Sequence, residues 1–542
     1  MPGSPAATDP STRRPAALGP RAPARGPRYA AATPHPEVTR VALDVLGHGG
    51  NAVDAAVAAA AACTVVQPFS SSAAGVGWAT VHDATTGVTE VLDFHGAVPL
   101  AFDPSALTPT QAGTVDWRRL ESSGRAILGM LTPSAVPGWA ALLERHGTWR
   151  LADALAPAIA LAHDGVVVSE ALADVIARRW TLLSAWPSTL AVLAPGGRPL
   201  RAGERLVQPD LGTTLERIAC NGPEELQQGQ TAEGLVRFVA DAGGALCTAD
   251  LVAHPPRWAP ALTGRFRDLE IRTAPGPCGD VALVEALHLL DGFGPFEGPL
   301  DPDYVHVSVE TAKLVAADRA RYLGTPDRPA PATLLSPARV ERLRRRIGPR
   351  ASTGSFAGRG PEDTITLAVV DGAGSAVHLM QTVGNLFGTG AVAAGTGLFL
   401  NSSLYFAYTA EVRPGEPIEQ NPCTMMAFDA AGSLRLAIGT PGGKTRVETV
   451  RQMLVDVVDF GMDLQAAVDE GRFLAGHDGA VEIEAELGPL PPALEADLTA
   501  RGHGIRAVGE RFGTGQAVAI DPTTHERLAA ADWRLEASAA AG

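Results

Sequence analysis

The sequence predicts a mixed α/β fold with a large buried core. Residues 255–275 and 360–440 are rich in strand-like segments, whereas residues 280–350 have mostly helical spacing. Hydrophobic residues make up 46% of the 542 residues and charged residues 19%, a balance that allows a large core and argues against global disorder. A chain of this length holds two or three ordinary domains or one large α/β assembly.

The N-terminal part of the chain is predicted to contain both helices and strands. Residues 37–47 have the apolar spacing of a helix, which ends at a glycine-rich turn. Asn51 is a suitable N-cap for a second, alanine-rich helix, because its side chain can accept a hydrogen bond from the first turn. Further elements are expected as strands at 78–82 and 89–94, and as helices from 139, at 151–163 and at 169–177.

The beginning of the chain is predicted to be a flexible tail over residues 1–33. It is rich in Pro, Ala and Arg and contains no continuous apolar segment of the kind that a secretory signal requires. The most apolar run, residues 55–66, is too short to span a bilayer. We therefore expect a cytoplasmic protein with no membrane partner.

Charge and side-chain chemistry argue against several kinds of ligand. A formal net charge of −15 is opposite in sign to what nucleic-acid binding requires. The 13 histidines form no HExxH motif, so we expect no metal and no cofactor. The cysteines are widely spaced without a CxxC pair, which argues against a disulfide framework and fits a reducing compartment. They are Cys63, Cys220, Cys247, Cys278 and Cys423.

A threonine opens a predicted strand two thirds of the way along the chain. Residues 364–370 alternate, so Thr364, Thr366 and Ala368 share one face of the strand. On this pattern alone Thr364 is an ordinary strand residue. A second threonine, Thr382, follows in a glycine-containing segment, and the sequence around both favours a chemical role.

A series of motifs accompanies the two threonines along the chain. The motifs are Gly49–Ala56, Gln67–Ser72 with Gly75 and Gly77, Thr132–Trp139, Leu155–Ala162, Phe387–Gly390, Gly439–Gly443, Val450–Phe460 and Gly471–Phe473. In this order they resemble the γ-glutamyltranspeptidase family of N-terminal-nucleophile hydrolases, over most of the chain from about residue 34. The resemblance implies the family's fold, a four-layer αββα sandwich.

The resemblance also implies a precursor that cleaves itself. The Thr364 hydroxyl would attack the carbonyl of Asp363 and divide the chain into a large subunit, 34–363, and a small subunit, 364–542. The two subunits would remain together as a heterodimer. The new α-amine of Thr364, with an ordinary pKa of about 8, would act as general base for its own hydroxyl.

Three further residues match catalytic positions of the family. Thr382 matches the threonine that orients the nucleophile. Gly442 and Gly443 match the glycine pair whose backbone N–H groups form the oxyanion hole, where glycine lets the backbone approach the substrate closely. With Thr364, these residues make up the implied reaction machinery.

The residues that hold the amino-acid part of a γ-glutamyl substrate are changed. His95 replaces the arginine that binds the α-carboxylate, and it lacks the bidentate guanidinium. Gly384 replaces an asparagine, while Ser403 and Phe406 replace the glutamine and aspartate that hold the α-amino group. These substrate-binding positions therefore argue against a glutathione-type donor.

Two further substrate-binding positions point in the same direction. Cys423 and Thr424 replace a serine pair that helps to bind the carboxylate. Lys444 follows the glycine pair directly, and we hypothesise that it offers a positive charge to a carboxylated acyl group. The alternative for Lys444 is a solvated lysine at the start of a helix.

The predicted function is that of a self-cleaving hydrolase or acyltransferase that forms an acyl-Thr364 intermediate. Its substrate would be a small-molecule amide or related acyl compound, in antibiotic biosynthesis or a similar pathway, where relatives also break carbon–carbon bonds. One alternative is a true γ-glutamyl transferase or hydrolase. Another is a non-catalytic pseudoenzyme scaffold. A nucleotide-binding loop at Gly439–Thr445 is the third, but Ile438 stands where a P-loop needs glycine.

Overall fold

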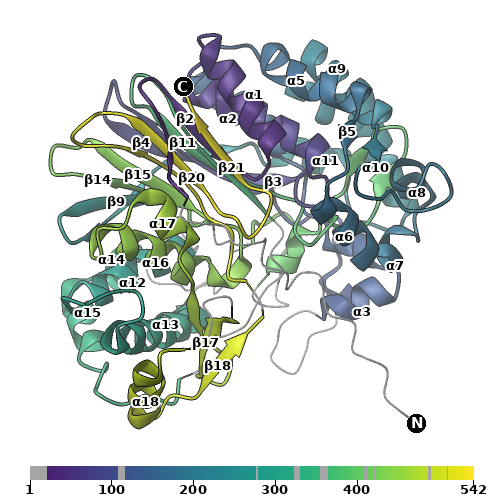
Figure 1. The fold of residues 1–542 in the computed structure, drawn as a ribbon. Helices are drawn as coiled ribbons and strands as arrows, with labels where there is room; N and C mark the ends of the chain where they lie inside the picture. Colours follow the sequence, from purple (N-terminus) through teal and green to yellow (C-terminus); the bar gives the residue numbers. More distant parts are fainter. Residues whose placement is uncertain are drawn as a thin grey trace.

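The computed structural model describes residues 21–107, 116–275, 279–322, 330–354, 364–407, 412–418, 422–485, 490–509 and 511–542. Two sheets lie face to face, with helices packed on the outer face of each (Figure 1). This arrangement is the predicted four-layer αββα sandwich. No helix within these residues is long and apolar enough to cross a bilayer.

The first sheet contains the strand that begins after Thr364. Its order is β21-β2-β10-β11-β3-β4-β7, and its neighbours pair antiparallel. The strands are β2 Ala30–Thr33, β3 Val76–Asp83, β4 Val88–Phe94, β7 Arg257–Pro260, β10 Ile365–Val370, β11 Ala376–Thr382 and β21 Ser538–Ala541.

The second sheet has the order β1-β20-β19-β15-β14-β9-β8 and is also antiparallel. Its strands are β1 Ala24–Gly26, β8 Leu262–Phe266, β9 Leu269–Thr273, β14 Met425–Phe428, β15 Leu434–Gly439, β19 Gln516–Ile520 and β20 Arg527–Ala531. Two small sheets have two strands each, β5 Val166–Val167 with β6 Arg205–Leu206 and β12 Val392–Ala393 with β13 Leu398–Phe399. A third has three strands, in the order β16 Phe473–Ala475, β17 Val481–Glu484 and β18 Ile505–Val508.

Helices cover the two outer faces. The first group packs on the first sheet or beside it: α1 Pro36–Gly47, α2 Ala52–Val66, α3 Trp117–Ser122, α4 Ala135–His146, α5 Leu151–Asp164, α6 Glu170–Arg178, α7 Trp180–Leu183, α8 Pro187–Leu193, α9 Pro209–Asn221, α10 Gln230–Asp241 and α11 Thr248–Ala253. The second group belongs to the other outer layer: α12 Gly279–Leu290, α13 Pro302–Tyr322, α14 Pro331–Leu334, α15 Pro337–Arg344, α16 Arg446–Val458, α17 Leu464–Asp469 and α18 Pro492–Arg501.

Successive side chains of β10 point to opposite faces of the first sheet, and both faces are covered. Leu367 and Val369 point into the core shared with α1 and α2, whereas Ala368 and Val370 point into the core between the sheets. Both faces of the strand are therefore buried, with small residues on the side where the sheets meet. The predicted N-cap of α2 is confirmed, because Asn51 forms a capping box with Asp54.

The expectation of a disordered tail up to residue 33 is wrong for its last part. Residues 24–26 form β1 and residues 30–33 form β2, which lies between β10 and β21. Alanine has low strand propensity, so the sequence Ala-Ala-Ala-Thr gives no local strand signal. Pairing with distant strands decides the conformation of this segment.

Two buried histidines join α13 to the segment after α18. His306 Nδ1 and His503 Nε2 lie 2.8 Å apart, and His306 Nε2 donates to the Gly348 carbonyl at 2.7 Å. In the neutral form of His306 its Nδ1 therefore accepts a hydrogen bond from His503 Nε2. With Glu310 these rings are the one group of candidate metal ligands within the described ranges. Here the two rings are hydrogen-bonded to each other, and Lys313 Nζ donates to Glu310 at 2.8 Å. These side chains therefore form hydrogen bonds within the protein that connect α13 to the segment after α18.

Acidification is expected to destabilise the protein through His503. Burial, and then the neighbouring charge of Lys313, lowers the pKa of His503 from 6.5 to about 4. Below pH 6.5 the unfolded chain binds a proton on this histidine, which the folded chain accepts only near pH 4. Stability is therefore lost as the pH falls through that window. His503→Gln keeps a donor for His306 but does not titrate. Its melting temperature should fall less steeply than that of the wild type between about pH 7 and pH 4.5, and equal slopes in thermal scans would contradict this account.

Candidate active site

Thr364 lies just before β10, beside the end of β11. The antiparallel register pairs Ile365 with Gln381, which brings Thr364 next to Thr382. Thr364 Oγ1 donates to Thr382 Oγ1 at 3.2 Å, and both side chains are buried. Thr382 Oγ1 also accepts a 2.9 Å hydrogen bond from the Gly384 N–H, which fixes its position. The structure thus brings together the two threonines that the sequence predicts to be catalytic.

A third side chain at this hydroxyl is Arg446, which sequence reasoning missed. Its Nη2 donates to Thr364 Oγ1 at 2.7 Å, and the residue is only 2% exposed. Arg446 is the first residue of α16 and follows the glycine loop closely. A positive charge is disfavoured at a helix N-terminus. An arginine at the first position of a predicted helix is therefore unusual, and this is the sequence signal that could have identified Arg446.

Gly442 and Gly443 lie in the loop between β15 and α16. β15 packs against β10 and β11 across the two sheets, so the loop and Thr364 come from opposite sheets. The φ angles are 136° at Gly442 and 53° at Gly443, both in the region that favours glycine. Thr445 holds the Gly442 carbonyl with its N–H and its hydroxyl, at 3.0 and 2.8 Å. The loop therefore leads directly into the helix that carries Arg446.

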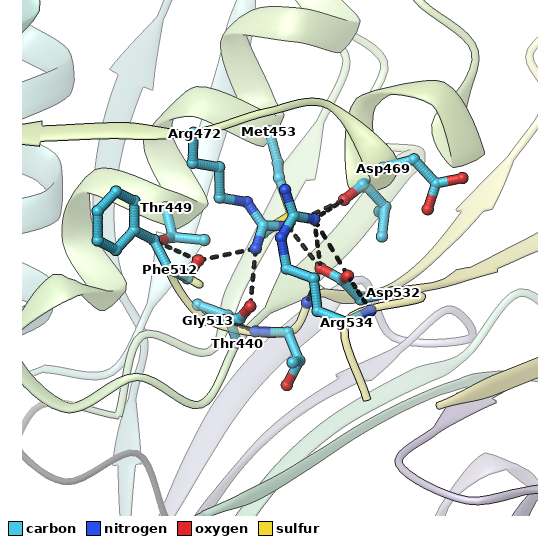
Figure 2. A network of polar contacts seen from close by, with 12 residues as sticks. Thr440, Thr449, Met453, Asp469, Arg472, Phe512, Gly513, Asp532 and Arg534 are labelled. Carbon is cyan, nitrogen blue, oxygen red and sulfur yellow. Dashed lines mark hydrogen bonds and ion pairs between the residues drawn. The ribbon is translucent and has the colours of Figure 1, made fainter. Parts of the chain in front are cut away.

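A buried ionic network holds the segment that packs against this loop (Figure 2). Arg472 donates to Asp532 at 2.7 Å and to the carbonyls of residues 512 and 513 at 2.7 and 2.9 Å. The next residue, Thr514, donates its N–H to Thr440 Oγ1 at 2.9 Å. The segment 512–514 therefore links Arg472 to Thr440, which lies in the loop of the glycine pair.

The charges within this network balance one another. Burial raises the pKa of the Asp532 carboxyl, but Arg534 and Arg472 overcome that effect and hold the pKa below its usual value. Arg534 also pairs with Glu484 at 2.5 Å, and Glu484 accepts the Phe512 N–H at 2.7 Å. Removing one member would leave a buried charge uncompensated, which typically costs about 3–5 kcal/mol.

His95 lies directly after β4 and is 2% exposed. Neither ring nitrogen has a hydrogen-bond partner among the residues that the structure describes. Burial, and then the charge of Arg446, lowers the pKa of the imidazole to about 3. The ring is therefore neutral at physiological pH and does not supply the fixed positive charge of an arginine.

The backbone around Gly384 leaves no room for a side chain. Its φ is +93°, and a Cβ atom there would lie 2.6 Å from the carbonyl carbon of Ser402. Ser403 begins the short 3-10 turn Ser403–Phe406, and its N–H donates to Asn401 at 3.1 Å. The Ser403 hydroxyl is buried and has no partner within the described parts of the chain. An asparagine at position 384 is thus sterically excluded by this backbone.

Cys423 and Thr424 contact the protein framework. The Thr424 hydroxyl lies 2.7 Å from the Thr80 hydroxyl on β3, so this pair joins the two sheets. The Cys423 N–H donates to Asp280 at 2.6 Å. These contacts give both residues a structural role, and their assignment to substrate binding stays a prediction.

Some predicted site residues lie outside the described parts. Asp363 is among them, so the geometry of the Asp363-Thr364 bond is not described. For Phe406 and Lys444 the structure describes the backbone, in the 3-10 turns Ser403–Phe406 and Gly443–Thr445, but not the side chains. The hypothesis for Lys444 stays a prediction.

Thr382→Val is expected to slow both self-cleavage and turnover. Valine keeps the shape of threonine but removes the acceptor that orients the Thr364 hydroxyl, so we expect kcat to fall about 10- to 100-fold with KM little changed. Thr64→Val is the matched control, because Thr64 is a buried threonine whose hydroxyl donates to the Ala61 carbonyl of its own helix. Equal kinetics for the Thr382 variant and the wild type would contradict the orienting role.

Sequence relatives carry names of processed enzymes. The acylase ACY 1 proenzyme of Pseudomonas sp. (strain V22) is 31% identical over 530 residues, which cover 95% of this chain and 93% of that protein. The glutathione hydrolase proenzyme of Escherichia coli (strain K12) is 29% identical over 516 residues, covering 89% and 87%. The chain therefore resembles acylases and glutathione hydrolases over nearly its whole length.

The fold comparison agrees with these relatives. The crystal structure of cephalosporin acylase from Bacillus halodurans matches with a TM-score of 0.87 and 26% identity, covering 99% of both chains. It confirms the predicted N-terminal-nucleophile hydrolase fold. The family model described as Gamma-glutamyltranspeptidase matches residues 38–542. The chain thus belongs to the γ-glutamyltranspeptidase family of N-terminal-nucleophile hydrolases.

Proposed function

We propose that this protein is a self-cleaving acylase in which Thr364 is the nucleophile. The observation that carries the proposal is the arrangement around one hydroxyl. Thr364 Oγ1 donates to Thr382 and accepts from Arg446, just before β10, which packs against β15, the strand that leads into the glycine loop. Cleavage of the Asp363-Thr364 bond would give subunits 34–363 and 364–542, in line with relatives named as proenzymes.

The proposed chemistry follows from these contacts. Once the chain is cut, the α-amine of Thr364 takes the proton from its own hydroxyl as Oγ attacks the acyl carbonyl. Thr382 keeps the hydroxyl in position. Backbone N–H groups of Gly442 and Gly443 stabilise the oxyanion. The leaving amine takes the proton, and water then hydrolyses the acyl-Thr364 ester.

The altered substrate-binding positions favour a donor other than glutathione. His95 is neutral and Gly384 has no room for a side chain, so two groups that would hold a γ-glutamyl amino acid are missing from these positions. A relative of similar fold is named a cephalosporin acylase, which supports a non-glutamyl acyl group here. It also supports the antibiotic-related setting that we propose. A cytoplasmic location is supported by the free state of the cysteines within the described ranges.

A substrate screen on the mature enzyme tests the proposal. Amides with neutral acyl, short carboxylated acyl, glutaryl and γ-glutamyl groups would be compared, with γ-glutamyl-p-nitroanilide as the control. We expect kcat/KM for the best non-glutamyl amide to exceed that for the control by at least about tenfold. A clear preference for the γ-glutamyl control would favour the alternative, a true γ-glutamyl transferase or hydrolase. If the Lys444→Met variant has an unchanged KM for every accepted substrate, the hypothesis that Lys444 binds the acyl group is rejected.

A further inference from the structure

Two carbonyl groups of the glycine loop are held by threonine side chains. The Thr440 hydroxyl donates to the Pro441 carbonyl at 2.7 Å. Thr445 donates both its N–H and its hydroxyl to the Gly442 carbonyl, at 3.0 and 2.8 Å. Both threonines are buried. Each of the two carbonyls therefore has a fixed direction, set by a buried hydroxyl.

A planar peptide group connects each of these carbonyls to the N–H of the next residue. The peptide bonds 441–442 and 442–443 are trans, and in a planar trans peptide the C=O and the N–H point in opposite directions. The direction of the Pro441 carbonyl therefore sets the direction of the Gly442 N–H. In the same way, the Gly442 carbonyl sets the direction of the Gly443 N–H. These are the two N–H groups that are proposed to stabilise the oxyanion.

We propose that Thr440 and Thr445 are positioning residues that aim the two oxyanion donors of the glycine pair. Thr440 fixes the N–H of Gly442, and Thr445 fixes the N–H of Gly443. The inference rests on the proposed function, in which these two N–H groups form the oxyanion hole. Glycine lets the backbone approach a substrate closely, but it also lets the peptide groups rotate more freely than other residues do. Hydrogen bonds from neighbouring side chains are needed to hold them.

The Thr440 hydroxyl is itself held from the side of the buried ionic network (Figure 2). Its oxygen accepts the Thr514 N–H at 2.9 Å. A hydroxyl has a single proton to donate, and here that proton goes to the Pro441 carbonyl. Thr514 belongs to the segment 512–515, and two carbonyls of this segment accept from Arg472 at 2.7 and 2.9 Å. The network thus fixes the hydroxyl, and the hydroxyl fixes the peptide group of the loop.

The expected effect of these threonines is on the rate of the chemical step. A hydrogen bond weakens steeply when its donor turns away from the acceptor. The oxyanion gains its charge only in the transition state, so a donor that points elsewhere lowers kcat and leaves KM little changed. A misdirected N–H is still present in the loop. The loss should therefore be smaller than the roughly 100- to 1,000-fold that removal of a donor causes.

The test compares valine and serine variants of both threonines with the wild type, on the best amide found in the substrate screen. Valine keeps the shape of threonine and removes the hydroxyl, so kcat of Thr440→Val should fall about 10- to 100-fold with KM little changed. Thr445→Val keeps the backbone N–H bond to Gly442, and its kcat should fall less, about three- to tenfold. Thr440→Ser and Thr445→Ser keep the hydroxyl and should stay within about threefold of the wild type.

Thr189→Val is the matched control for Thr440→Val. The Thr189 hydroxyl is buried, accepts the Val392 N–H at 2.9 Å and donates to the Gly390 carbonyl at 2.8 Å. It therefore makes the same pair of backbone hydrogen bonds as Thr440, at a place outside the glycine loop. We expect both valine variants to lower the melting temperature to a similar degree, but only Thr440→Val to lower kcat.

Thr396→Val is the matched control for Thr445→Val. Thr396 is buried and donates its N–H and its hydroxyl to the Ala393 carbonyl, three residues earlier, at 3.0 and 2.8 Å. Thr445 makes the same two bonds to the carbonyl three residues before it. Thr396→Val should leave kcat unchanged, because its carbonyl belongs to a turn outside the glycine loop.

A thioamide version of the same substrate reports on the oxyanion hole directly. Sulfur is a larger and weaker hydrogen-bond acceptor than oxygen, so well-aimed N–H donors discriminate against it. The ratio of kcat/KM for the amide to that for the thioamide should therefore drop in Thr440→Val, to about a tenth of the wild-type ratio or less. Thr189→Val should keep the wild-type ratio. A purely structural role of Thr440 would slow both substrates equally and leave the ratio unchanged.

A failure of this inference and a failure of the proposed function give different results. Wild-type kcat in Thr440→Val, or an unchanged ratio of amide to thioamide, would overturn the inference, while acyl-Thr364 detected by intact mass would leave the proposed function standing. A wild type that forms no acyl-Thr364 with any substrate would overturn the proposed function, and the inference with it. If Thr440→Val fails to mature, Thr440→Ser decides. A loss of kcat of about tenfold or more, with the hydroxyl retained, would then count against the positioning role, and nearly wild-type kcat with an unchanged ratio would support it.

Discussion

Thr364→Ala is expected to leave a single full-length chain of 56.0 kDa, whereas the wild type should yield two fragments. Alanine removes the hydroxyl that would attack the Asp363 carbonyl and that bonds Thr382 and Arg446. Activity should fall to the background level of the assay. Denaturing electrophoresis and intact mass distinguish the two outcomes, and N-terminal sequencing of the smaller wild-type fragment should begin at Thr364.

Thr364→Ser is the matched variant for this experiment. It keeps the hydroxyl and removes only a methyl group, so cleavage should persist at a reduced rate. Two fragments from Thr364→Ala would assign the cleavage to another residue. A wild type that stays full length would favour the pseudoenzyme alternative, because the fold would then be kept without the reaction. Thr364→Ser with no cleavage would mean that the methyl group is needed to orient the hydroxyl.

The fold was largely predictable because its signals are local or repeated along the chain. The N-cap Asn51 and the alternation of residues 364–370 are examples, and the ordered motifs fix the family. The missed elements depend on distant partners. The segment Ala30–Thr33 becomes a strand only because β10 and β21 lie on either side of it. No window of sequence around residue 30 contains that information.

In the site too, residues within sequence motifs were predictable, whereas a contact between distant parts of the chain was not. Thr364, Thr382, Gly442 and Gly443 were identified from motifs, and the structure places the two threonines in contact. Arg446 was missed because it belongs to no motif, and its contact with Thr364 spans 82 positions of the chain. Lys444, the cation that the sequence singled out, is two residues earlier.

Gly442→Ala is expected to lower kcat by about 100- to 1,000-fold, the usual effect of losing one oxyanion donor. Gly442 has a φ of 136°, which a residue with a Cβ atom rarely adopts. A Cβ there would also lie 2.9 Å from Thr445 Oγ1 and 3.5 Å from the Cα of Gly513. The backbone would have to rotate, which would turn the N–H groups of the loop away from the substrate oxygen.

Backbone strain must be separated from the loss of the donor. Gly461→Ala is suited to this, because Gly461 also has a positive φ, of 62°, and nothing within 4 Å of an added Cβ. Gly461→Ala should lose about 1–2 kcal/mol of stability, and Gly442→Ala at least as much because its added Cβ also meets Thr445. Only Gly442→Ala should lose turnover with KM little changed. Stopped-flow measurement of the acylation step would report the loss directly. A Gly442→Ala enzyme with wild-type acylation would remove this glycine from the oxyanion hole, since the strain alone would then account for everything that the substitution does.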